Sequence, residues 1–90
     1  MDGTPRLGHG FRFQWEPAQS CHVLLYPEGM IRLNQSAGEI LARCDGSRDI
    51  AAIVAELEQA FARPDLRPEV EAFLTMAIGK RWLRLDAPTP

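Results

Sequence analysis

The first part of the chain alternates apolar and polar residues in the way typical of β-strands. Residues 11–16 place three aromatic side chains on one face, which is the period of a half-buried strand. Residues 21–26 are almost wholly apolar and predict a second, more buried strand. A turn at residues 27–29 then leads into a third, short strand over Met30 to Leu33.

A helix is predicted immediately after the third strand. Asn34 is a strong candidate for its N-cap, because an Asn side chain can accept hydrogen bonds from the free N–H groups of a first turn. The buried face has helical spacing and consists of Ala37, Ile40, Leu41 and Cys44. Gly46 can adopt the left-handed conformation that ends a helix, and Ser47 is expected to cap the next one.

Two further helices complete the pattern. The second is expected to bury Ile50, Ile53, Val54, Leu57 and Phe61, and the third, which begins at Pro68, to bury Val70, Phe73, Leu74, Ala77 and Ile78. Residues 82–85 form a final extended piece that folds back. The predicted class is therefore α+β, with a three-stranded antiparallel sheet followed by a three-helix bundle, similar to a winged helix-turn-helix with its β-part first.

Composition and length indicate one folded domain without an affinity for polyanions. The 90 residues are 46% hydrophobic and 24% charged, with a net charge of −2, so neither nucleic acid nor an anionic membrane is an expected partner. Residues 1–10 are predicted to be a flexible N-terminal arm, residues 11–86 the domain and residues 87–90 a C-terminal tail. With no long apolar run and no signal-peptide pattern, the expected location is cytoplasmic.

No combination of residues suited to catalysis or to metal binding is evident. His9 and His22 lack an i, i+4 partner and a nearby cysteine pair, which argues against zinc. Cys21 and Cys44 are expected to be buried, reduced thiols, with a disulfide or a metal site as the lesser alternatives. We see no nucleophile with a histidine and a carboxylate, and no glycine-rich phosphate loop after a strand. The sequence therefore predicts a protein that is not an enzyme and carries no cofactor.

A peptide-binding groove is predicted between the third strand and the third helix. A short strand at a sheet edge leaves N–H and C=O groups unpaired, so that an incoming peptide can pair with them while the helix supplies apolar contacts. The predicted site residues are Met30, Ile31, Arg32 and Leu33 on the strand, and Val70, Phe73, Leu74, Ala77, Lys80 and Arg81 on the helix and its end.

The charges near the third helix leave two interpretations open. The basic cluster of Lys80, Arg81 and Arg84 either complements the dipole of the helix or flanks a groove for an acidic peptide. DNA binding is the alternative that the helix-turn-helix shape suggests. However, Glu69 and Glu71 lie in the first turn of the third helix, where carboxylates would repel the phosphate backbone, and the few basic residues after it make a small phosphate footprint.

The sequence resembles the PqqD family over nearly its whole length. The resemblance rests on Pro5-Arg6-Leu7, on residues 23–34 with their Pro-Glu-Gly turn, on Ala37-Gly38-Glu39-Ile40-Leu41, on Cys44-Asp45-Gly46, and on pieces from Ile50 to Leu83. One position departs from the family pattern. The family tends to place a glycine directly before the tryptophan, whereas here Arg81 precedes Trp82.

This resemblance implies a recognition domain for ribosomally made, modified peptides. Its implied partners are the precursor peptide PqqA and PqqE, a radical S-adenosylmethionine enzyme that joins a Glu and a Tyr side chain in pyrroloquinoline quinone (PQQ) biosynthesis. The implied binding surface is the strand Met30–Leu33 with the helix over Val70–Arg81. A DNA-binding regulator and a carrier that stacks the finished quinone on residues 11–15 are the alternatives, and an exposed strand could also pair two chains as a homodimer.

Overall fold

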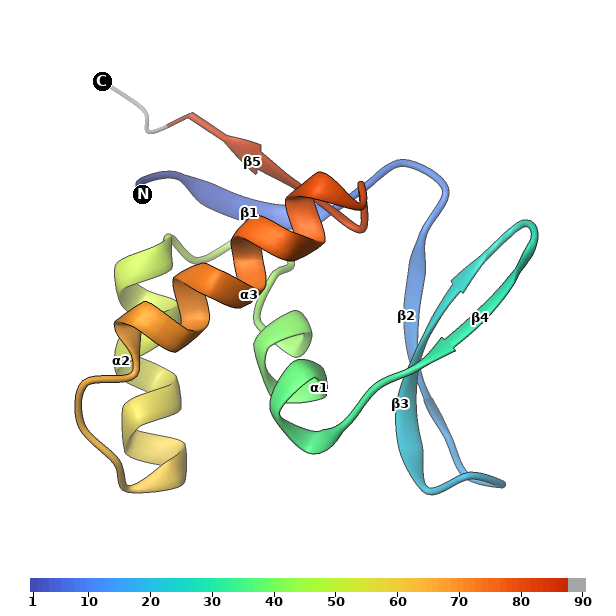
Figure 1. The fold of residues 1–90 in the computed structure, drawn as a ribbon, viewed down its shortest axis with the longest axis horizontal. Helices are drawn as coiled ribbons and strands as arrows, with labels where there is room; N and C mark the ends of the chain where they lie inside the picture. Colours follow the sequence, from blue (N-terminus) through green and yellow to red (C-terminus); the bar gives the residue numbers. More distant parts are fainter. Residues whose placement is uncertain (88–90) are drawn as a thin grey trace.

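The computed structural model describes residues 1–87, and within this range the chain forms five strands and three helices (Figure 1). In chain order they are β1 (Thr4–Leu7), β2 (Arg12–Glu16), β3 (Cys21–Tyr26), β4 (Gly29–Arg32), α1 (Gln35–Ala42), α2 (Ile50–Phe61), α3 (Arg67–Gly79) and β5 (Leu83–Asp86). The α+β class and the three-stranded antiparallel sheet followed by three helices are as predicted.

The three-stranded sheet has the order β2-β3-β4, with both connections antiparallel. Phe13, Leu24 and Ile31 lie opposite one another across it. These three residues all belong to or pack against the main hydrophobic core, so this face of the sheet is turned toward the helices. Leu24 is fully buried, while Trp15, at the far end of the same face, is 52% exposed.

Only two residues connect the edge strand β4 to α1. Leu33 is buried in the core, and the side-chain oxygen of Asn34 accepts a hydrogen bond from the backbone N–H of Ala37 at 2.8 Å. The predicted N-cap is therefore confirmed. Because the chain passes directly from strand to buried residue to cap, the position of the sheet relative to the helices is tightly determined.

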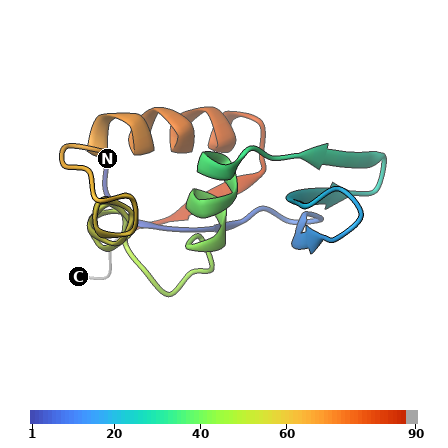
Figure 2. The same ribbon diagram turned by 90° about the horizontal axis from the view of Figure 1, so that it is seen from below.

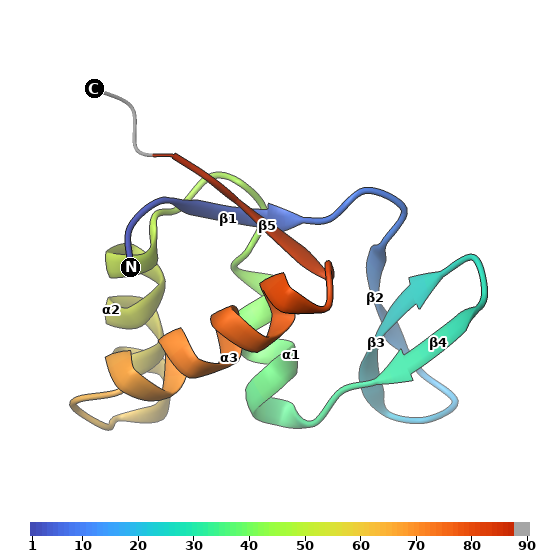
Figure 3. The same cartoon turned by 45° about the horizontal axis from the view of Figure 1, so that its top comes forward.

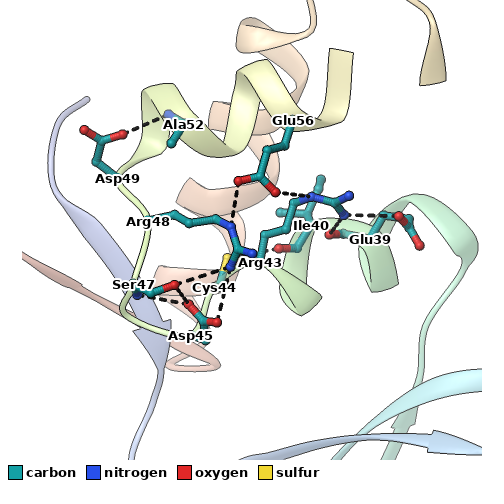
Figure 4. Close-up of polar contacts among 10 residues, drawn as sticks. All are labelled: Glu39, Ile40, Arg43, Cys44, Asp45, Ser47, Arg48, Asp49, Ala52 and Glu56. Atoms are coloured by element: carbon teal, nitrogen blue, oxygen red, sulfur yellow. Dashed lines mark hydrogen bonds and ion pairs between the residues drawn. The ribbon is translucent and has the colours of Figure 1, made fainter. Parts of the chain in front are cut away.

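The corner between α1 and α2 holds a network of charged side chains (Figure 4). Glu56 accepts from Arg48 Nε at 2.7 Å and from Arg43 Nε at 3.3 Å. Gly46 has a φ of +85°, as predicted. Ser47 does not cap α2, contrary to expectation, since it donates to the carboxylate of Asp45 and these bonds hold the pKa of Asp45 below its usual value.

The cap of α2 is instead Asp49, whose carboxylate accepts from the backbone N–H of Ala52 at 2.8 Å. Ser and Asp are almost equally good N-caps. Two such residues stand two positions apart at this corner, so local preference alone does not decide between them. Because the hydroxyl and N–H of Ser47 bond to the carboxylate of Asp45, Asp49 becomes the cap of α2.

The prediction of a flexible arm over residues 1–10 is wrong for Thr4–Leu7. These residues form β1, which pairs antiparallel with β5, so that Pro5 faces Leu85 and Leu7 faces Leu83. The two strands run side by side across the helices (Figures 1 and 3). Gly8, which follows β1, allows close packing, because a Cβ on it would lie 2.1 Å from the Arg81 carbonyl oxygen. Of the predicted tail, residues 88–90 lie outside the described residues.

Arg81 ends α3 in a backbone conformation that favours glycine. Its φ is +66°, its N–H donates to the Ile78 carbonyl, and the N–H of Trp82 donates to the Ala77 carbonyl, each at 3.0 Å. These are the two hydrogen bonds of a Schellman motif, with Arg81 at the position usually held by glycine. The arginine that departs from the family pattern therefore occupies a position where a side chain is costly.

Arg81→Gly is expected to raise the free energy of unfolding by about 0.5–1 kcal/mol, because glycine adopts the left-handed conformation without the Cβ penalty. Gly46→Ala is the converse change and should lower it by about 1 kcal/mol. Urea unfolding of the three proteins checks both values. An Arg81→Gly protein no more stable than the parent would mean that Arg81 is not left-handed in solution.

Candidate functional site

A groove runs between the end of β4, the first turn of α1 and one face of α3. In the view of Figure 2, β4 and α3 lie along the same side of the molecule and α1 lies between them. We call this the β4–α3 groove. It is lined by Arg32, Leu33, Asn34, Ser36, Ala37, Ile40, Glu69, Phe73, Met76 and Trp82.

The backbone of β4 presents hydrogen-bonding groups at the open edge of the sheet. The N–H of Leu33 donates to the carbonyl of His22 at 3.0 Å, and the register then pairs Arg32 with Val23 and Ile31 with Leu24. In an antiparallel pair, hydrogen-bonded and non-hydrogen-bonded residues alternate. Ile31 therefore bonds to β3, whereas the N–H and C=O groups of Met30 and Arg32 point away from it.

The side of α3 that faces the groove is a helical stripe separate from its buried face. Glu69, Phe73 and Met76 all line the groove, and their spacing of four and three residues places them along one side of the helix. Continuing this spacing by four residues places Lys80 at the C-terminal end of the same stripe. Met76 is 37% exposed, so it adds apolar surface to this side of the groove.

Some predicted site residues lie in this groove and others do not. Arg32, Leu33 and Phe73 line it. Met30 and Ile31 precede Arg32 on β4. Met30 is exposed, and Ile31 packs against the core. The structure places Val70, Leu74 and Ala77 in the hydrophobic core, with exposed fractions of 2%, 0% and 0%. These three residues support the groove from beneath and do not line it.

Sequence reasoning missed Met76 and Trp82 as lining residues of the groove. It assigned the buried stripe and the groove to the same residues. The available signal was Met76 itself, an apolar residue that lies outside the buried stripe of α3. Arg81 lines a different hollow, which it shares with His9 and Arg84, and Lys80 is a lining residue of neither that hollow nor the groove.

The residues that line the groove include no histidine or cysteine and one carboxylate, that of Glu69. Within residues 1–87, no three His, Cys, Asp or Glu side chains are grouped so that they could hold a metal ion. Both cysteines are free. Burial raises the pKa of the Cys44 thiol to about 12, and the thiol donates to the Ile40 carbonyl, so it is a neutral core group. None of the helices in the part of the chain described is long and apolar enough to cross a membrane.

Comparisons with known proteins point to one family. Residues 21–83 match the family model for coenzyme PQQ synthesis protein D (PqqD). A PqqA binding protein from Pseudomonas aeruginosa (strain UCBPP-PA14) is 56% identical over 87 residues, which cover 96% of this chain and 95% of the relative. One from Azotobacter vinelandii is 54% identical over 86 residues, with 94% of each chain covered.

A solved structure has the same fold. It is the solution NMR structure of the PqqD part of Methylobacterium extorquens PqqCD, described as a functional, stand-alone recognition element for ribosomally synthesized and post-translationally modified peptides. The TM-score is 0.68 at 32% identity, and the match covers 89% of this chain and 87% of the other. These relatives are binding or recognition proteins, in agreement with the predicted class, and they confirm the resemblance seen in the sequence.

The backbone amides of β4 should exchange with solvent at two alternating rates. In the free protein we expect the amide protons of Met30 and Arg32 to exchange at least about tenfold faster than those of Ile31 and Leu33, since only the latter are hydrogen-bonded to β3. Residue-resolved hydrogen exchange by NMR measures this. Equal protection of all four amides would contradict an open edge at β4.

Proposed function

The chain belongs to the PqqD family, and we propose that it binds the precursor peptide PqqA in the β4–α3 groove and presents it to the radical S-adenosylmethionine enzyme PqqE. In this proposal the protein is an adaptor of PQQ biosynthesis. It supplies a binding surface in the cytoplasm, and the cross-linking chemistry belongs to PqqE. The names of the relatives support the peptide partner, and the similar solved structure, described as a recognition element, supports the adaptor role.

The observation that carries the proposal is the open edge of β4 beside an exposed apolar helix face. Met30 and Arg32 direct two N–H and two C=O groups outward, which is enough to hold a peptide of a few residues as an added strand. Hydrogen bonds to the backbone do not depend on the side chains of the peptide. They therefore supply affinity, and the groove must supply selectivity.

Selectivity would come from side chains that alternate along the bound strand. Successive residues of a strand point to opposite faces of the sheet, so every second side chain of the peptide would point toward the floor of the groove. There it would meet Phe73, Met76 and Trp82. Aromatic residues and methionine are favoured in binding surfaces because they offer large, adaptable apolar contacts.

Presentation to PqqE requires that part of the peptide stays outside the groove. A strand added to β4 covers only the residues that pair with it, and flanking residues of the peptide keep their freedom. The Glu and Tyr that PqqE joins would lie in such a flanking segment, where a second protein can reach them. Binding by strand addition is thus compatible with later chemistry on the same peptide.

Arg32→Pro is expected to weaken binding of PqqA about tenfold or more relative to Arg32→Ala. Proline removes the outward N–H of residue 32 and places a ring at the open edge, but it breaks no bond to β3. Arg32→Ala is the matched control, because it removes the same side chain and keeps the N–H. Isothermal titration with PqqA gives the two affinities.

Circular dichroism should show the same melting temperature for Arg32→Pro and Arg32→Ala within a few degrees. Ile31→Pro, which removes a bond inside the sheet, should melt well below both. If Arg32→Pro is folded and binds PqqA as tightly as Arg32→Ala, the peptide does not add to β4.

Lys80 is expected to speed the encounter with an acidic peptide. It lies at the end of the groove stripe of α3, and charges at the rim of a site change association rates more than affinity. Lys80→Gln should lower the association rate roughly two- to fivefold at low salt and flatten its dependence on ionic strength.

Arg84→Gln is the matched control for this charge change, since Arg84 lines the separate hollow that also contains Arg81 and His9. Stopped-flow measurements at several salt concentrations compare the two variants. A larger effect of Arg84→Gln than of Lys80→Gln would place the incoming peptide on the other side of α3.

A further inference from the structure

A second hollow continues the β4–α3 groove toward the N-terminal end of α3. The two share Ser36, Ile40 and Glu69 as lining residues, so they form one trough that passes the first turn of α1. We call this second part the end pocket. Beyond the shared residues it is lined by Leu57, Phe61, Arg63, Leu66 and Val70.

The floor of the end pocket is apolar and comes from all three helices. Ile40 belongs to α1, Leu57 and Phe61 to α2, and Val70 to α3. The charged residues of the end pocket, Arg63 and Glu69, lie at its opening. Arg63 Nη2 and Glu69 Oε1 are 3.9 Å apart, and both side chains are about two-thirds exposed. An apolar floor with a polar mouth suits an apolar side chain whose backbone stays at the surface.

The loop between α2 and α3 holds the pocket in this shape. Ala62 and Asp65 both have left-handed backbone conformations, with φ values of +52° and +61°. The N–H of Leu66 donates to the carboxylate of Glu58 at 3.0 Å, which brings the loop back onto α2. These contacts place Leu66, which is 5% exposed, at the wall of the pocket before any ligand arrives.

The volume of the end pocket limits what it can hold. The cavity measures about 80 Å³. An apolar cavity of about 150 Å³ can hold a benzene ring, so the end pocket is about half the size that an aromatic side chain needs. It has room for the end of a Val, Leu, Ile or Met side chain, whereas part of a tyrosine or phenylalanine ring would stay outside its open mouth.

From this continuity and size we infer that the end pocket receives one aliphatic side chain of the same peptide whose backbone pairs with β4. The inference rests on the proposed function. This anchor residue lies beyond the Arg32 end of the added strand, because the trough leaves β4 at Arg32 and runs past Ser36 to Leu66. Peptides would then be selected by two features: a segment able to form a strand, and an aliphatic residue at a fixed distance from it.

The test replaces each aliphatic residue of PqqA singly by Ala and by Phe, and measures the affinity of each peptide for the parent protein. We expect one position outside the strand-forming segment at which Ala weakens binding about 10- to 100-fold, the cost of leaving one aliphatic side chain unburied. Phe at this position should also bind more weakly, since the pocket is too small for a ring.

Leu66→Ala identifies the pocket, because it enlarges the end pocket and leaves the β4–α3 groove unchanged. The peptide with Phe at the anchor position should bind this variant more tightly than it binds the parent protein. The loss of affinity caused by Ala at the anchor position should be smaller in this variant than in the parent protein. If Leu66→Ala does not fold, Phe61→Leu can replace it, because it also puts a smaller side chain at a half-buried position of the end pocket. Met76→Ala is the matched control in the groove and should keep the full sensitivity to the anchor residue.

Two results would overturn the inference. One is that no single aliphatic replacement in PqqA weakens binding by more than about threefold, well below the loss expected for a buried side chain. The other is that Leu66→Ala and Phe61→Leu leave the preference between the Ala, Phe and original peptides unchanged. In either case a weaker affinity of Arg32→Pro would still support strand addition, whereas a parent protein that does not bind PqqA would refute the proposed function itself.

Discussion

The fold depends most on the junction at which the edge strand β4 becomes helix α1. Leu33 is buried there beside Ile40 in the core, and Asn34 caps the helix. The burial of Leu33 contributes about 1.5–3 kcal/mol and the cap about 1 kcal/mol. With no spare residue between them, the sheet cannot move relative to the helices without losing both. This rigidity keeps the open edge of β4 at a fixed position beside α3, which a binding groove requires.

The sequence predicted the elements whose signals are local. The alternation in β2, the apolar run of β3, the cap at Asn34 and the helical stripes all follow from spacing and residue type. It did not predict β1, because the partner of Thr4–Leu7 lies almost eighty residues away at β5, and glycine and proline usually indicate a mobile end. When the two ends of a chain pair with each other, the residue pattern within each end does not indicate that pairing.

The structure brings the two elements of the predicted site, β4 and α3, to one groove, and it places only some of the predicted residues there. Spacing along α3 identifies a buried face, and only Met76, an apolar residue outside that face, indicated that the wall of a groove lies on a separate stripe. Leu74 and Ala77 therefore entered the predicted site although they are fully buried, and Met76 was left out. Arg81 shows the opposite case. A local departure from a family pattern marked a residue that the structure places in a costly left-handed conformation.

The central claim is that a peptide becomes the fourth strand of the β2-β3-β4 sheet. Intermolecular nuclear Overhauser effects between isotope-labelled protein and unlabelled PqqA test it most directly, because neighbouring strands bring backbone protons close together. We expect contacts from peptide backbone protons to Met30 and Arg32, and from peptide side chains to Phe73, Met76 and Trp82. Contacts confined to the outer edge of β2, or to the hollow around Arg84, would contradict it.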